Sequence, residues 1–207
     1  MQINVGRPKD LEKHQRILNA AKRLFLKCGY HGSSMKQIAD EAGVTKLTVY
    51  NHFQDKANLF TCAIEKTCEE SIHACPNQLH AQSNFQQEFI HICELALNIS
   101  NLPEAIKLEH LLLELAAEQN PLALQFYNAS HQKMCLVWQD FFQHAIEFNF
   151  IQCDAVDQQT QLILSLLLGH RHHEVLLGIR AIPTTAERHT IILQSIELFM
   201  LKYQKSI

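Results

Sequence analysis

Glycine and proline are scarce in this chain, with six glycines and five prolines among 207 residues. Residues of high helix propensity, namely leucine, alanine, glutamine and glutamate, are abundant, and this combination favours helices over strands and turns. Long hydrophobic runs are also missing: the strongest one, LILSLLLG at residues 162–169, is too short to cross a bilayer. We therefore expect an all-α protein without a membrane-spanning segment.

Several functional signatures are absent as well. The N-terminal stretch MQINVGRPKD lacks the apolar core of a signal peptide, which predicts a cytoplasmic location. The seven cysteines form no CxxC pair, and their odd number fits reduced thiols packed as small hydrophobic side chains. The sequence contains no G-x-S-x-G elbow, glycine-rich phosphate loop or HExxH pair. We expect neither an enzyme nor a bound cofactor.

Charge is divided unevenly along the chain. Residues 1–60 hold ten Lys and Arg against five Asp and Glu, a balance of +5. Residues 61–207 hold eight against sixteen, a balance of −8, so that the whole chain carries −3. A basic end on an acidic body is typical of a protein whose one end meets a polyanion.

Apolar residues recur at three- and four-residue spacing through most of the chain, which predicts amphipathic helices. The expected helices cover residues 9–29, 35–42, 45–53, 56–76, 84–100, 103–118, 121–148, 157–180 and 184–204. Thr184 and Glu187 have the spacing of a capping box at the start of the last one. We expect two domains, residues 1–58 and residues 59–207.

Two of these helices, 35–42 and 45–53, are joined by a tight turn, the arrangement of a helix-turn-helix. Three positions support this interpretation. Ala39 is small where the second helix crosses, Gly43 stands where the turn requires a positive φ, and Val49 faces back into the hydrophobic centre.

The exposed face of the second helix carries side chains that suit the edges of DNA bases. On a helical wheel Leu47 and Asn51 point away from the buried side, while Thr48 and Tyr50 lie on the flanks. Lys46 reaches outward from the first turn on its long stem. Asparagine pairs with adenine, lysine with guanine, and leucine or threonine contacts the thymine methyl group. Together with the basic end, this face predicts binding to double-stranded DNA.

The segment ILNAAKRLFLKCGYHGSSMKQIADEAGVTKLTVYNHFQDKANLF, residues 17–60, resembles the DNA-binding domain of the TetR (tetracycline-repressor) family along its whole length. The GRPK stretch before it resembles the basic arm of many members. The resemblance implies an N-terminal three-helix helix-turn-helix domain and a C-terminal helical domain for ligand binding and dimerisation. It also implies a homodimeric repressor of a roughly palindromic operator, released by a small hydrophobic effector. Residues 102–127 loosely resemble AefR-like members, which names no ligand.

Carried onto this sequence, the resemblance assigns operator contacts to both helices of the motif and to the residue that opens the next helix. His52 and Lys56 occupy positions that contact phosphates in the family. Leu47 stands where relatives often have a small residue and Asn51 where they have a larger one, so the operator sequence is not predicted. The expected DNA-binding residues are Ser34, Thr45, Lys46, Leu47, Thr48, Tyr50, Asn51, His52 and Lys56.

The remainder of the chain carries no chemical motif. Its many aromatic residues are mostly typical of a helical core, and by analogy with the family a few line an apolar effector pocket. The polar and aromatic residues expected in that pocket are His110, Glu114, Trp138, Phe141 and Phe142.

The last two predicted helices are more apolar than a helix normally needs for its own core. Two such helices from each subunit can pack as a four-helix bundle around a two-fold axis. The residues predicted to form this dimer interface are Leu162, Leu166, Leu167, Leu176, Ile191, Ile192, Leu198 and Phe199.

An alternative function stays open, a metal- or redox-sensing regulator. His170, His173 and Glu174 share a helix face at spacings with which a zinc site can begin, but no second ligand cluster stands out. A thiol sensor needs a nearby cation, and the glutamates around the cysteines of residues 62–75 oppose it. The cysteines considered for such a sensor are Cys62, Cys68 and Cys75.

Overall fold

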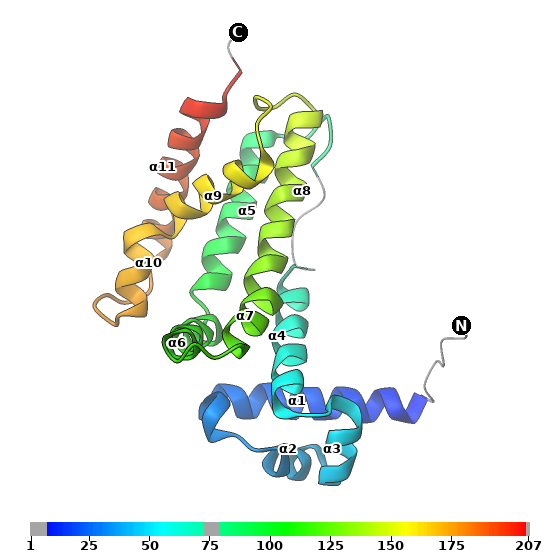
Figure 1. Ribbon diagram of the computed structural model, residues 1–207. Coiled ribbons are helices and arrows are strands. Elements are labelled where there is room, and N and C mark those ends of the chain that lie inside the picture. The colour runs from blue at the N-terminus through cyan, green and yellow to red at the C-terminus, as the bar shows by residue number, and fades with distance from the viewer. Residues whose placement is uncertain (1–7, 73–78, 206–207) are drawn as a thin grey trace. The chain divides into compact units, whose positions relative to one another are not determined.

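The computed structural model describes residues 8–72 and 79–205, and every regular element within these two stretches is helical (Figure 1). The expected all-α fold is confirmed. The chain divides into two compact units. Unit 1 comprises the described residues of Met1–Glu69 together with Leu111–Ser130, and unit 2 comprises those of Glu70–His110 together with His131–Ile207.

The helices are α1 (Pro8–Gly32), α2 (Met35–Ala42), α3 (Lys46–Phe53), α4 (Lys56–Ile72), α5 (Phe85–Ser100), α6 (Pro103–Ala117), α7 (Leu122–Tyr127), α8 (Lys133–Glu147), α9 (Val156–Leu167), α10 (Gly169–Leu176) and α11 (Thr185–Tyr203). In the described stretches, no helix combines the length and the apolarity that crossing a membrane requires.

The first helices of unit 1 form a small bundle. The apolar side chains of α1 that the periodicity predicts to be inside, among them Ile17, Leu18 and Phe25, are buried. Gly29 adopts φ 73°, a conformation that favours glycine, and interrupts the helical geometry where the sequence predicted an end. α2 packs against both α1 and α3, and Figure 1 shows α2 and α3 side by side below α1.

The C-terminal part of α6 and all of α7 also belong to unit 1, far from its other helices in the sequence. Phe126 of α7 is fully buried, and its ring centroid lies 4.7 Å from that of Phe60 and 5.3 Å from that of Tyr30. Gln125 Nε2 donates to Thr61 Oγ1 at 2.8 Å. Because aromatic pairs bury large apolar areas, these contacts stabilise the unit around α4.

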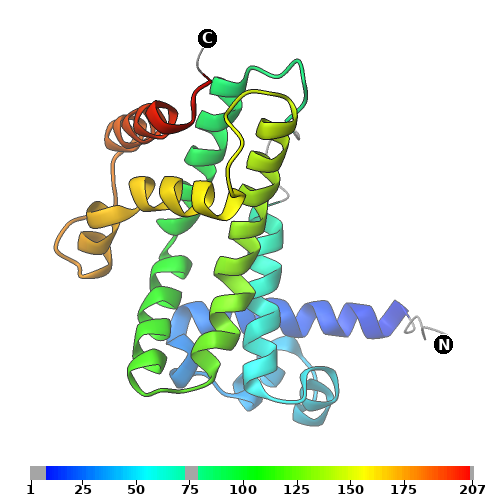
Figure 2. The same cartoon turned by 45° about the horizontal axis from the view of Figure 1, so that its top comes forward.

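Unit 2 is built around a cluster of aromatic side chains. Phe89 of α5, Trp138 and Phe142 of α8 and Phe199 of α11 are all fully buried. The ring centroids of Phe142 and Phe199 are 5.0 Å apart in a stacked arrangement. Figure 2 shows α9 running crosswise to α5 and α8, and α9 packs against α8 and α11.

Two predicted helices are interrupted. The prediction of one helix over 157–180 is wrong, because Gly169 adopts φ 34° between α9 and α10, and Gly178, with φ 68°, follows the end of α10. The helix predicted over 121–148 contains a π-helical turn, Asn128–Gln132, between α7 and α8. Within this turn the hydroxyl of Ser130 donates to backbone carbonyl oxygens of the preceding turn, which competes with regular helical bonding.

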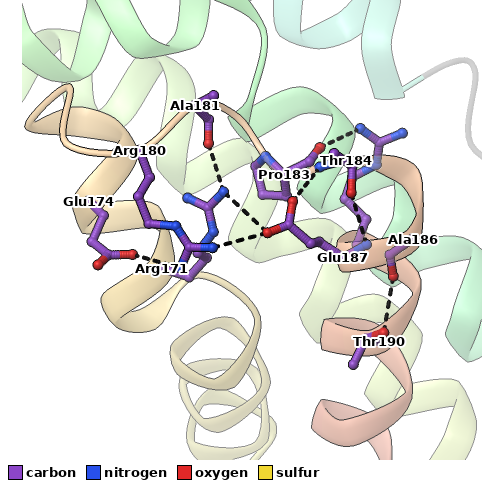
Figure 3. A network of polar contacts seen from close by, with 10 residues as sticks. Arg171, Glu174, Arg180, Ala181, Pro183, Thr184, Ala186, Glu187 and Thr190 are labelled. Atoms are coloured by element: carbon purple, nitrogen blue, oxygen red, sulfur yellow. Dashed lines mark hydrogen bonds and ion pairs between the residues drawn. The ribbon is translucent and has the colours of Figure 1, made fainter.

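A network of polar contacts fixes the corner between α10 and α11 (Figure 3). The guanidinium of Arg180 lies 3.3 Å from the carboxylate of Glu174 and 3.1 Å from that of Glu187, and Arg171 lies 3.8 Å from Glu187. Thr184 forms the predicted capping box with Glu187 at the start of α11. Hydrogen bonds from Thr184 hold the pKa of Glu187 below its usual value.

Candidate nucleic-acid interface

The start of α2 and the turn after it have the geometry that the sequence predicts. Ser34 is the N-cap of α2, and its hydroxyl oxygen accepts a hydrogen bond from the backbone N–H of Gln37 at 3.3 Å. Gly43 adopts φ 64°, and its N–H bonds back to the carbonyl oxygens of Ala39 and Asp40. The tight turn of a helix-turn-helix is therefore present.

The start of α3 is fixed by a pair of threonines. Thr45 is the N-cap, and its Oγ1 accepts from the backbone N–H of Thr48 at 3.2 Å. The two hydroxyl oxygens lie 2.8 Å apart and share a hydrogen bond. Because these contacts satisfy both side chains locally, they hold the first turn of α3 in place.

The two sides of α3 differ as expected. Val49 is fully buried and Phe53 is nearly so, which anchors the helix to unit 1. On the other side Leu47 is 68% exposed, and Asn51 is exposed as well. An anchored helix with this outward face can present side chains to base edges in a DNA groove.

Two ammonium groups of the predicted interface each lie over an aromatic ring. Lys46 Nζ lies 5.6 Å from the centre of the Tyr50 ring, and Lys56 Nζ lies 4.5 Å from that of Tyr30. Partial burial lowers the pKa of the Lys56 ammonium. The cation–π contacts hold both charges in place, where they can meet phosphates.

His52 has partners that the sequence did not predict. Its Nε2 atom lies 3.1 Å from Asp10 Oδ1, and its side chain is only 15% exposed. The ring of His14 meets it edge-on at a centroid distance of 5.7 Å and stacks on Phe53. Asp10 and His14 are four residues apart on one face of α1, but only the packing of α1 on α3 brings them to His52.

Residues 17–61, which run from α1 into α4, match the family model for bacterial regulatory proteins of the tetR family. The chain belongs to the TetR family. It is a DNA-binding transcriptional regulator and not an enzyme.

Two relatives show how the similarity is distributed. The TetR-family chain is 31% identical to the transcriptional activator FasR of Mycolicibacterium smegmatis over 80 aligned residues. This aligned region covers 39% of this chain and 36% of FasR. It is 23% identical to the transcriptional regulator AcrR of Shigella flexneri over 197 aligned residues. This alignment covers 92% of this chain and 90% of AcrR.

A solved structure extends the similarity to the fold. The flavonoid-responsive regulator FrrA superposes with a TM-score of 0.76 at 23% identity, over 94% of this TetR-family chain and 98% of FrrA. At this identity the likeness shows a shared fold and no shared ligand. The AefR-like resemblance stays a prediction.

Three of the predicted effector residues are neighbours within unit 2 of the TetR-family chain. The ring centroid of Trp138 lies 6.2 Å from that of Phe141 and 5.7 Å from that of Phe142. Trp138 is fully buried, and no described residue accepts a hydrogen bond from its Nε1–H. A buried donor without an acceptor is unfavourable, and a ligand that supplied one would relieve it.

The other two predicted effector residues lie elsewhere. His110 is exposed on α6 in unit 2, and its Nε2 atom lies 2.6 Å from the carbonyl oxygen of Leu176. Glu114 is exposed in unit 1, 3.9 Å from His31. Within unit 2, His110 is not one of the residues that form the aromatic core cluster, and Glu114 belongs to the other unit.

The predicted dimer residues fall into three groups by exposure. Leu167, Ile192 and Phe199 are buried in the core of unit 2 within the single chain. Leu198 is 51% exposed. The half-buried members are Leu162, Leu166, Leu176 and Ile191. Helical periodicity cannot separate these groups, because a core stripe and an interface stripe have the same spacing.

The structure also shows where the residues considered for metal or redox sensing lie. His170 lies on the surface with Nε2 3.7 Å from Glu174, whose carboxylate also pairs with Arg180. In the described parts of the chain, no group of three or more His, Cys, Asp or Glu is arranged to hold a metal ion. His173 is exposed, Cys62 and Cys68 are half-buried on α4, and Cys75 lies outside the described residues.

A further polar cluster in unit 2 was missed by the sequence analysis. His131, in the π-helical turn, lies with its Nε2 atom 2.6 Å from Glu109 Oε1 of α6. Burial opposes ionisation of Glu109, but the hydrogen bond to His131 and the charges of His131, His172 and His110 outweigh it and lower its pKa. Helical periodicity in the sequence could not predict this cluster, because its members come from separate helices.

Proposed function

We propose that this TetR-family regulator is a homodimeric repressor that binds a roughly palindromic operator and is released from it by a small hydrophobic molecule. The observation that carries the proposal is the exposed face of α3, where Leu47 and Asn51 project opposite the buried anchors Val49 and Phe53. A rigidly held helix with such a face suits the major groove, whose base edges it can reach.

In this proposal the side chains of the interface have separate roles. Asn51 and Leu47 read base edges, an adenine and a thymine methyl group respectively, and Lys46 contributes a guanine contact. Phosphate contacts position the motif and carry no sequence information directly. The remaining proposed operator contacts are Ser34, Thr45, Thr48, Tyr50, His52 and Lys56.

The homodimer is proposed to pair through α9 and α11. Exposed leucines of α11, Leu198 at 51% and Leu201 at 68%, lie on a helix whose other side is already buried in unit 2. Apolar side chains left exposed on a packed helix suit a partner surface. A two-fold dimer places two α3 helices on half-sites about 34–36 Å apart, or a multiple of that spacing.

The effector is proposed to be an apolar or aromatic molecule that binds unit 2. The aromatic cluster around Trp138, with its unpaired indole N–H, offers an apolar environment and one polar point for orientation. FrrA, which shares the fold, is described as flavonoid-responsive, and a flavonoid is a hydrophobic aromatic compound.

Release follows from coupled binding. Operator and effector favour different conformations of the dimer, so each weakens the binding of the other by the same factor. An effector that bound both conformations equally would shift nothing, however tightly it bound.

Binding-site selection on random duplexes, at about 0.1–0.2 M salt, tests the DNA-binding part of the proposal. We expect one enriched inverted repeat, occupied by two subunits. Recovery of no enriched sequence, or of a single half-site bound by a monomer, contradicts it. The selected duplex then serves to measure release by each compound found in a ligand screen.

A further inference from the structure

The ring of Tyr30, near the C-terminal end of α1, joins a charged group to an aromatic cluster within unit 1. The ammonium of Lys56 lies over this ring, 4.5 Å from its centre. The ring centroids of Phe60 and Phe126 lie 5.0 Å and 5.3 Å from that of Tyr30. Lys56 and Phe60 belong to α4 and Phe126 belongs to α7, so three helices of unit 1 meet at one ring.

Phe126 is the most deeply buried member of this group, with no exposed surface. Its ring meets that of Tyr30 at an interplanar angle of 67° and that of Phe60 at 66°. Such edge-to-face pairs favour particular orientations of the two rings. Gln125, the preceding residue, donates from Nε2 to Thr61 Oγ1 at 2.8 Å, which ties α7 to α4. α7 therefore limits the positions that the Tyr30 ring can take.

The charges near this ring favour a cation over its face. Burial and then the charge of Asp55 raise the pKa of the Tyr30 phenol, so the ring is neutral at neutral pH. Asp55 Oδ1 accepts a hydrogen bond from the backbone N–H of Asn58 at 2.8 Å, at the start of α4. The Lys56 ammonium has lost part of its hydration, since burial lowers its pKa. The negative face of a neutral ring attracts such a cation.

Phe126 lies far outside the segment that matches the DNA-binding domain of the family. That segment, residues 17–61, includes Tyr30 and Lys56 but not α7, which joins unit 1 only through the tertiary fold. A lysine ammonium on its flexible stem can occupy many positions. Fixing it before DNA arrives reduces the entropy that binding must remove, which strengthens binding.

We propose that Tyr30 and Phe126 are positioning residues for the phosphate contact of Lys56, so that α7 contributes to DNA affinity from outside the helix-turn-helix. The Tyr30 ring holds the ammonium at one place, and Phe126 holds the ring. The inference rests on one part of the proposed function, the contact between Lys56 and a backbone phosphate. It predicts that the loss of either ring weakens DNA binding only while Lys56 is present.

The test uses the full chain and a fluorescein-labelled duplex of arbitrary sequence, at about 50 mM salt, because phosphate contacts do not depend on sequence. Anisotropy titrations measure the affinity of each variant. Tyr30→Leu should lower it about 2–5-fold, the strength of a cation–π contact at a partly exposed site. Phe126→Leu should lower it by a smaller factor. Tyr30→Phe, which keeps the ring and removes only the hydroxyl, should keep most of the affinity.

Double variants separate positioning from a general loss of stability. In a Lys56→Gln background, Tyr30→Leu and Phe126→Leu should lower the affinity no further. Lys46→Gln is the matched background, because it removes an ammonium that lies over a different ring, 5.6 Å from the centre of Tyr50. There both substitutions should weaken binding as they do in the wild type. Thermal melting by circular dichroism establishes that each variant is folded.

Three results would overturn the proposal. Equal losses in the Lys56→Gln and Lys46→Gln backgrounds would show that the two rings act only on stability. Wild-type affinity in Tyr30→Leu or in Phe126→Leu would show that the ring does not position the charge. Wild-type affinity in Lys56→Gln alone would remove the phosphate contact on which the inference rests. Because the duplex is arbitrary, failure to select an operator would remove the proposed repressor function and leave these comparisons interpretable.

Nuclear magnetic resonance of the free protein provides a second measurement, which needs neither ring variant. In protein labelled with carbon-13 at the lysine Cε atoms, the Cε protons of Lys56 should be shifted upfield of those of Lys36, an exposed lysine of α2. The reason is that the ring current of Tyr30 shields nuclei above its face. Lys56→Gln identifies the signal by its loss. A Lys56 signal at the position of Lys36 would overturn the proposal.

Discussion

The ammonium group of Lys56 lies 4.5 Å from the centre of the Tyr30 ring, which ties the first turn of α4 to the C-terminal end of α1. Partial burial lowers the pKa of Lys56, and the electron-rich face of the ring replaces part of the hydration that the ammonium has lost. The charge is thereby held at a defined place just after α3. The proposed phosphate contact of Lys56 can therefore be tested by a single substitution.

Lys56→Gln should weaken binding to all duplexes by a similar factor. The slope of log affinity against log salt concentration should become shallower by about one, because one phosphate contact is lost. Anisotropy titrations over a salt series measure both quantities. Lys66→Gln, which removes a charge further along α4, is the control and should leave the slope unchanged; a similar decrease in both variants would mean that only overall charge is being sensed.

Asn51→Ala should change the preference at particular base pairs and leave the rest of the binding site as it was. A good side-chain contact to a base discriminates by roughly 1–3 kcal/mol. Quantitative binding-site selection with the wild type and the variant compares the two profiles position by position. Identical profiles would show that Asn51 is merely a solvent-exposed residue of α3.

Leu198→Glu should convert the dimer to monomers and greatly weaken operator binding. The side chain is half exposed in the single chain, so the charge should disturb the partner surface and leave the subunit fold intact. Light scattering after size-exclusion chromatography measures the mass. Leu136→Glu on α8, an exposed leucine of unit 2, is the control. A dimeric Leu198→Glu protein would place the interface elsewhere.

Thr184→Ala should destabilise the protein by about 0.5–2 kcal/mol, because the first turn of α11 loses its cap. The Thr184 hydroxyl accepts from the backbone N–H of Glu187 at 3.3 Å, and alanine cannot replace that acceptor. Urea unfolding measures the change. Thr185→Ala, one residue further on, should change stability by less than about 0.5 kcal/mol. Equal losses in the two variants would argue against a specific cap.

A hydrophobic effector should change the fluorescence of Trp138, the single tryptophan of the chain. Its ring is fully buried among Phe89, Phe141 and Phe142, so a ligand that enters this cluster must alter its surroundings. Trp138→Phe should remove the signal while keeping most of the binding measured by thermal shift. Each hit should lower operator affinity by about 5–150-fold, the range of a coupling of ~1–3 kcal/mol. Release by divalent metals or oxidants alone would favour the metal or redox alternative.

The sequence by itself determined the local structure of the DNA-binding end. Ser34, Gly43 and Thr45 act through contacts within a few residues, so their roles as caps and turn could be read directly from the order of residues. The buried anchors Val49 and Phe53 followed from helical spacing for the same reason. The capping box of α11 belongs to this class too.

Tertiary structure alone decided which side chains meet across helices. Asp10 reaches His52, Glu109 reaches His131, and Phe126 packs on Phe60 only because separate helices fold together. It also decided which leucines of α9 and α11 are core and which remain at the surface, since Leu167 and Leu198 fit the same periodic pattern but only Leu167 is covered by the chain itself. The physical reason is that capping and turn geometry depend on near neighbours in the chain, whereas burial depends on what else folds against a surface.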